Sequence, residues 1–261
     1  MSADSRLGSV QVRELWRHPV KSLQGEQLAE ATVDADGLVG DREWGIRDEA
    51  TGNILTGRRE PSLLLASARR TDEGDPAITL PDGDSITGAG EATDEALSTW
   101  LGRRVRLVSA LEEGPREAEF FEDATDDTSQ ALTFTMPTGH LVDTLPLLLL
   151  TTASLRRGQE VHAAGEWDVR RFRPNLLVEV DGTGWVEDGW CGQRVRVGED
   201  VELEPKAPCE RCSMVTRPQP GLGRDLDVFR ALAREHGATF GVWSSVAISG
   251  QVRVGDTVAV G

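Results

Sequence analysis

Short apolar segments separated by turn residues run along most of the chain, and they limit its fold more than any other feature. Strand-sized examples cover residues 44–47, 103–108 and 176–180. Two hairpin turns are indicated, one at Pro81-Asp82-Gly83-Asp84 and one at Gly198-Glu199-Asp200, because glycine tolerates the positive φ that tight turns need. This spacing predicts a mainly β protein with a few helices, and favours barrels or sandwiches over a parallel sheet.

Two segments have the apolar periodicity of helices. Residues 93–101 place Leu97 and Leu101 on one face, with Thr93 as the predicted cap and Gly102 as the stop. Residues 225–236 show the same pattern before Gly237. Between the predicted halves, residues 112–127 are rich in acid, and we expect them to connect two domains.

The composition limits the partners. A formal net charge of -16 argues against sequence-independent binding of nucleic acid and against docking on anionic lipid. The N-terminus has no apolar signal region, and no apolar run approaches the roughly 20 residues of a membrane span. Three cysteines cannot all pair, which favours a reducing compartment. We therefore expect a cytoplasmic protein.

The stretch Pro208-Cys209-Glu210-Arg211-Cys212 is the densest chemical signal in the chain. A thiolate is the reactive and metal-binding form of cysteine, and the neighbouring Arg211 favours it. Turn residues follow, so we expect a loop at the edge of a site. Structural zinc has weak support because two further ligands at regular spacing are missing, whereas a redox disulfide between Cys209 and Cys212 stays possible.

Three other segments, residues 16–22, 37–42 and 170–175, combine basic, polar and turn residues. Each alone is most simply a solvated loop. Together they supply the groups that a phosphate-bearing ligand needs, because arginine forks and lysine point charges bind phosphate well. The glycines of the second segment would let a ligand approach the backbone closely. The side chains concerned are Lys21, Ser22, Arg42, Arg173 and Asn175.

In this order, the motifs Pro-Val-Lys-Ser (19–22), Gly-Asp-Arg (40–42), Phe-Arg-Pro-Asn (172–175) and Arg-Cys-x-x-x-Thr (211–216) resemble the MOSC family. That family is named for the C-terminal domain of molybdenum cofactor sulfurase. The branch that looks most similar contains the mitochondrial amidoxime reducing component and its bacterial relatives. The resemblance implies an N-terminal MOSC-associated β-barrel domain over residues 8–125 and a MOSC β-barrel domain over residues 126–261.

The resemblance also implies a molybdenum cofactor, Mo-molybdopterin, and no pyridoxal phosphate is expected. By position, Cys212 would be the catalytic thiolate ligand of the metal. The residues that would hold the cofactor are Lys21, Ser22, Arg42, Thr151, Thr152, Ser154, Arg173, Asn175 and Arg211. Relatives with reductase activity commonly have serine where this chain has Glu210. The carboxylate could change substrate preference or pKa values, or it could equally point to solvent.

The implied activity is a two-electron reduction of small N-hydroxylated or N-oxide-type substrates. A sulfur-transfer or cofactor-binding protein that uses a cysteine persulfide is the alternative, and Cys209 could resolve such a persulfide. The chain has no nicotinamide fingerprint and no second cysteine cluster. We therefore expect electrons to come from a separate flavin or iron–sulfur protein.

Overall fold

The computed structural model describes residues 10–112, 114 and 116–261. Its largest sheet has eight strands, and all neighbours pair antiparallel except β12 and β13. Across the sheet these are β18 (Val258–Val260), β14 (Val195–Val197), β15 (Val201–Glu210), β16 (Thr239–Ile248), β12 (Leu147–Thr151), β13 (Leu176–Glu179), β1 (Gln11–Arg17) and β2 (Glu26–Leu28). The two longest strands, β15 and β16, are neighbours in this sheet.

Four smaller sheets complete the β structure of the described residues. They are β17 (Gly250–Arg253) with β3 (Glu30–Asp34) and β4 (Gly37–Leu38); β5 (Trp44–Asp48) with β9 (Val105–Ser109); β6 (Ser67–Arg70) with β7 (Pro76–Thr79) and β8 (Ser85–Thr87); and β10 (Glu117–Phe121) with β11 (Ala131–Thr135). The mainly β class is confirmed, and both predicted hairpins are present as β7–β8 and β14–β15. Each of these sheets is open, with an edge strand at either end.

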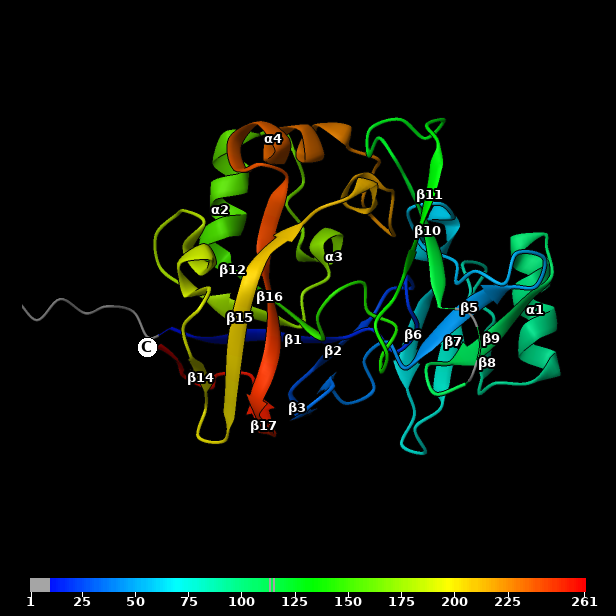
Figure 1. The fold of residues 1–261 in the computed structure, drawn as a ribbon, viewed down its shortest axis with the longest axis horizontal. Coiled ribbons are helices and arrows are strands. Elements are labelled where there is room, and N and C mark those ends of the chain that lie inside the picture. The colour runs from blue at the N-terminus through cyan, green and yellow to red at the C-terminus, as the bar shows by residue number, and fades with distance from the viewer. Residues whose placement is uncertain (1–9, 113, 115) are drawn as a thin grey trace, which may run out of the picture.

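The beginning of the chain lies within the lobe built by its end. In Figure 1 the blue strand β1 crosses the lobe that contains β15 and β16. Leu15 of β1 pairs with Leu176 of β13, and Val33 of β3 pairs with Gly250 of β17. The loop that follows β1 therefore starts in this lobe and runs toward the other one, where Val20 pairs with Trp44 of β5. Residues distant in sequence can meet there.

The helices are α1 (Glu91–Leu101), α2 (Thr152–Val161), α3 (Val169–Phe172) and α4 (Leu226–His236). The helices predicted at residues 93–101 and 225–236 are confirmed, and both end at a left-handed glycine, Gly102 and Gly237. The predicted cap Thr93 is wrong, because Gly90 precedes the helix and the Thr93 hydroxyl donates to the Gly88 carbonyl at 2.8 Å. Three single-turn helices are η1 (Pro61–Leu65), η2 (Val186–Trp190) and η3 (Ser213–Thr216).

Hydrophobic cores lie inside each lobe, where the first lobe contains α1 and strands β5 to β11 and the second contains the eight-stranded sheet with α2 and α4 (Figure 1). One core fills the first lobe beneath α1, around Leu63, Ile78 and Leu97. The second lobe buries aliphatic side chains on its large sheet and, beneath α2 and α4, an aromatic group in which the rings of Phe172 and Phe240 lie 4.3 Å apart. Phe172 belongs to a segment first interpreted as a basic loop, so this core anchors one of the candidate site segments.

The acidic stretch at residues 112–127 contains a β-strand in addition to loop segments. Strand β10 lies in its middle and pairs with β11 over five positions, from Glu117–Thr135 to Phe121–Ala131. Residues 113 and 115 of this stretch, like residues 1–9, lie outside the described residues. In the part of the chain that is described, no helix has the length and apolar character to cross a membrane.

Candidate functional site

One pocket of about 110 Å³ lies where the loops of both lobes meet. Seven of the ten predicted site residues line it: Lys21, Ser22, Arg42, Arg173, Asn175, Arg211 and Cys212. They come from the loop after β1, the loop before β5, the end of α3, and the segment that leaves β15. Motifs that are far apart in the sequence thus contribute side chains to a single cluster in the folded protein.

The backbone at the pocket is held in an uncommon conformation. Among the described residues, four that are not glycine have positive φ, and three of them are the pocket residues Ser22 (70°), Arg42 (52°) and Arg173 (55°). Such conformations cost of order 1–3 kcal/mol each and cluster at functional sites. Here the positive-φ conformations direct three polar side chains into the same pocket.

Glycines in the second motif adopt backbone conformations that favour glycine. Gly37 and Gly40 adopt φ of 114° and 87°. A side-chain carbon at Gly40 would lie 2.4 Å from Arg70, and one at Gly37 would lie 2.9 Å from Pro146. Neighbouring protein side chains therefore give a packing reason for glycine at these two positions, and the close approach of a ligand stays a prediction.

Cys212 lies directly before η3 and is half-buried in the pocket. Burial by itself raises the pKa of its thiol, but the Arg58 guanidinium, a hydrogen bond from the Met214 backbone and the charge of Arg211 together bring that pKa below its ordinary value. Cys209 is buried, and burial raises the pKa of its thiol. Of these two cysteines, Cys212 is therefore the one that favours the thiolate.

Arg58 and Asp143 complete the site, and sequence reasoning missed both. Asp143 accepts from the Lys21 ammonium at 2.6 Å and forms an ion pair with Arg58. Arg58 also lowers the pKa of the Cys212 thiol. In the sequence, Arg58 is indicated only by the Gly-Arg-Arg run at residues 57–59. Arg58 belongs to the site because the loop that carries this run contacts the other lobe in the folded protein.

Basic side chains dominate the electrostatics of the pocket. Burial first, and then the charge of Arg42, lower the pKa of Arg173 to about 9. Burial and the charges of Arg58, Arg42 and Arg173 also place the pKa of Lys21 well below its usual range. Two nitrogens here are buried and have no hydrogen-bond partner among the described residues, Nη2 of Arg173 and Nε of Arg211. Buried donors of this kind indicate a missing acceptor.

Asn175 lies at the inner wall and holds two strands together. Its Oδ1 accepts from the Leu148 backbone at 3.1 Å, and its Nδ2 donates to the Trp16 carbonyl at 3.3 Å. His18 lies behind this wall, fully enclosed, with neither ring nitrogen bonded. Burial, assisted by Arg173 and Arg42, lowers the pKa of His18, so its ring is neutral at physiological pH.

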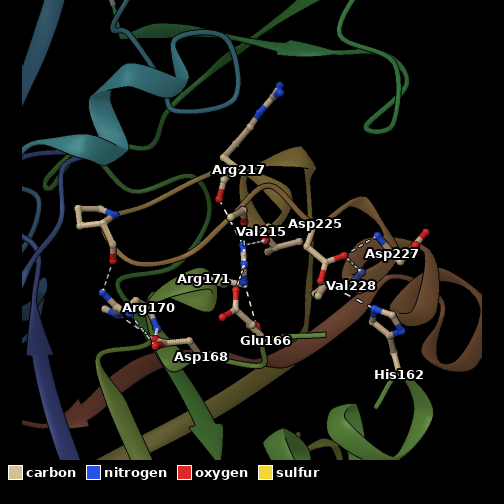
Figure 2. A network of polar contacts seen from close by, with 12 residues as sticks. His162, Glu166, Asp168, Arg170, Arg171, Val215, Arg217, Asp225, Asp227 and Val228 are labelled. Atoms are coloured by element: carbon tan, nitrogen blue, oxygen red, sulfur yellow. Dashed lines mark hydrogen bonds and ion pairs between the residues drawn. The ribbon is translucent and has the colours of Figure 1, made fainter. Parts of the chain in front are cut away.

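The segment after Cys212 is supported from beneath by Arg171, which is fully buried (Figure 2). Its guanidinium donates to the carbonyls of Val215 and Arg217, each at 3.3 Å, and of Gly223 at 2.9 Å. It also bonds the carbonyl of Glu166. The basic segment 170–175 is thus partly a buried scaffold for the thiol loop and not only a solvated patch.

Three predicted site residues lie away from the lining of the pocket. Thr151 and Ser154 donate from their hydroxyls to the buried carboxylate of Glu187, each at 2.6 Å. Thr152 donates to the carbonyl of Val180 at 3.2 Å. These contacts fix the start of α2, where Thr151 also accepts from the Ser154 backbone. Glu187 was not identified from sequence, because no nearby residue indicates that it is buried.

Two domain families match this chain. Residues 9–125 match the MOSC N-terminal beta barrel domain, and residues 137–259 match the MOSC domain. This chain belongs to the MOSC family. The resemblance inferred from the four motifs is confirmed.

Curated relatives of this MOSC protein carry two kinds of name. It is 28% identical to the mitochondrial amidoxime-reducing component 1 of Mus musculus, over 95% of this chain and 81% of that protein. It is 29% identical to the Homo sapiens protein of the same name, over 78% and 65%. It is 26% identical to the molybdenum cofactor sulfurase of Danio rerio, where 93% of this chain spans only 33% of the relative.

The pocket of this MOSC protein fits a molybdenum cofactor in its chemistry. Cys212 offers one soft thiolate, and the unbonded nitrogens of Arg173 and Arg211 offer donors to an anion. In the described part of the chain, no group of three or more His, Cys, Asp or Glu side chains could hold a metal by itself. A metal here would therefore need most of its ligands from a bound cofactor.

Proposed function

We propose that this MOSC protein is a molybdenum-cofactor-dependent oxidoreductase that reduces N-hydroxylated or N-oxide-type compounds by two electrons. The observation that carries the proposal is the placement of one thiol of lowered pKa, Cys212, in a pocket rich in basic side chains. Relatives named amidoxime-reducing components support the substrate class.

Each pocket residue has a proposed task. Cys212 would hold the metal through its thiolate, and Lys21, Arg42 and Arg173 would bind the anionic groups of the cofactor. Ser22, Asn175 and Arg211 would orient the rest of it. When bound, the cofactor supplies the redox-active metal at which a substrate N–O bond is reduced. The chain itself orients the substrate and excludes water through its apolar wall.

Electrons require a second protein in this proposal. We infer that a flavin or iron–sulfur protein delivers them, because the sequence contains neither a dinucleotide fingerprint nor a further cysteine cluster. We also propose a cytoplasmic setting, in line with the three unpaired cysteines.

The test uses protein made in a host that synthesises molybdenum cofactor. Metal analysis should give about one molybdenum per chain, and a reduced viologen dye should drive reduction of benzamidoxime, whereas NADH alone should not. Cys212→Ala should lose the metal and the activity, and Cys191→Ala, in which an isolated cysteine is replaced, should keep both.

Sulfur transfer is the competing result. A persulfide on Cys212 or Cys209 found by mass spectrometry, together with no turnover of any N–O substrate, would replace the reductase proposal. The buried position of Cys209 argues against its acting as an accessible sulfur carrier. Its Sγ instead accepts from Nη1 of Arg211 at 3.0 Å.

A further inference from the structure

Glu210 lies at the rim of the pocket, at the end of β15 and two residues before Cys212. Its side chain is exposed, whereas Cys209 beside it is buried, as the alternation of a strand requires. Among the described residues, the Glu210 carboxylate makes no hydrogen bond and no ion pair. It is therefore a free negative charge at the mouth of a basic cavity.

The other carboxylates near the pocket are already engaged. Asp143 bridges Lys21 and Arg58, and the buried Asp41 accepts from the His18 backbone and pairs with Arg42. The basic side chains inside the pocket would bind the proposed cofactor. Glu210 is then the lining carboxylate that is left to meet a substrate.

Apolar groups face the same opening. Met214, Leu145 and Pro146 are half-buried in the lining, and so is the ring of Trp243. Trp243 belongs to β16, which pairs with the end of β15. An apolar wall of this kind accepts an aromatic ring or an extended apolar part of a substrate. The single charge at the rim then selects the group that the substrate carries at its far end.

We propose that Glu210 is a specificity-determining residue that selects substrates with a cationic group distant from their N–O group. This inference rests on the proposed reductase function and names the substrate class of the same pocket. The carboxylate attracts a positively charged end and discriminates against a negatively charged one, because a rim charge changes relative affinities more than total affinity.

The experiment compares two benzamidoximes of similar shape, one with a para-aminomethyl group and one with a para-hydroxymethyl group. The readout is the ratio of their kcat/KM values with molybdenum-loaded protein and a reduced viologen dye. Wild type should prefer the aminomethyl compound, and Glu210→Gln should reduce that preference about three- to tenfold. Glu210→Lys should reverse it and favour the hydroxymethyl compound. Molybdenum content should stay equal in all three proteins.

Glu199→Gln is the matched control, because Glu199 is exposed in the turn at the opposite end of β15. It should keep the wild-type ratio. An unchanged ratio in Glu210→Gln would overturn the inference, as would preserved cation preference in Glu210→Lys.

Failure of the reductase proposal gives a different result. Wild type would then reduce neither compound. Calorimetric binding of the two corresponding benzamides, which cannot be reduced, then tests Glu210 separately. Loss of cation preference in Glu210→Gln would support the role of Glu210, and equal preference in both proteins would refute it.

Discussion

Asp127 and Arg217 form a two-pronged ion pair, with Nη1 and Nη2 of Arg217 each 2.6 Å from a carboxylate oxygen of Asp127. Arg217 is buried, and its Nη2 also donates to the carbonyl of Arg58 at 2.8 Å. The pair joins the connection between β10 and β11 to the segment that follows Cys212. Arg58, which lowers the pKa of the Cys212 thiol, is therefore positioned by contacts from both lobes.

Replacement of Asp127 tests this connection. Asp127→Asn should lower the free energy of unfolding by about 1–3 kcal/mol, because it leaves the buried Arg217 charge unpaired. Denaturant unfolding at neutral pH measures the change. Asp227→Asn is the control, since Asp227 pairs with Arg230 on the exposed face of α4, and its loss should cost less than about 0.5 kcal/mol.

The same pair predicts a dependence on acid. The hydrogen bond from Arg217 lowers the pKa of Asp127 in the folded protein. Its contribution to stability is thus present above the unfolded pKa of an aspartate and is lost as pH falls through the folded pKa. The stability gap between wild type and Asp127→Asn should shrink in acid, and a constant gap would contradict the assignment.

Arg171 should be a determinant of stability. Arg171→Ala leaves several buried carbonyls without donors, so we expect a loss of roughly 3–5 kcal/mol or failure to fold. Arg171→Lys should also destabilise, since one ammonium cannot reach all these carbonyls. Arg234→Ala on the exposed side of α4 is the control and should change unfolding little.

The cysteines should react in a defined order with pH. The pKa of Cys212 is lowered, whereas burial raises the pKa of Cys209 and of Cys191. In metal-free protein, alkylation of Cys212 by iodoacetamide should therefore begin at lower pH than alkylation of the other two. Mass spectrometry of peptides over a pH series measures this order. Arg58→Ala should move the Cys212 profile to higher pH, and an unmoved profile would exclude Arg58 as the cause.

Cofactor occupancy tests the proposed anchors. Arg42→Ala, Lys21→Ala and Arg173→Ala should each weaken retention of molybdenum about ten- to a hundredfold, which corresponds to one charge-assisted bond. Arg173→Lys should also weaken it, because the planar fork is lost. Arg13→Ala, at an exposed arginine of β1, is the control. Wild-type occupancy in all three alanine variants would place the cofactor elsewhere.

Glu187 gives a further pH test. Burial raises the pKa of its carboxyl, even though Thr151 and Ser154 donate hydrogen bonds to it. Its neutral form favours folding below the unfolded pKa, and that advantage is lost as pH rises through the folded pKa. The melting temperature of Glu187→Gln relative to wild type should therefore increase as pH rises from below the unfolded pKa of a glutamate toward the raised folded pKa. Ser154→Ala, assayed for both stability and cofactor content, separates a scaffold role from a cofactor contact.

Local patterns were sufficient for much of the fold. The helices near residues 93–101 and 225–236 and both glycine hairpins follow from apolar periodicity and from the φ freedom of glycine. Strand β10 within the acidic stretch was not predicted, because charge density hid its alternation and its partner β11 begins ten residues after β10 ends. Strand pairing at that distance leaves little trace in local composition.

The sequence by itself determined the chemical inventory of the candidate site: a cysteine beside an arginine, and three polar motifs with the order found in MOSC proteins. Tertiary structure decided which of those groups meet. It brought Arg58 and Asp143 to Cys212, gave Arg171 a scaffold role, and directed Thr151 and Ser154 toward Glu187. The physical reason is that burial and the neighbours from distant strands set the charge and orientation of a side chain, and neither is encoded in its local sequence.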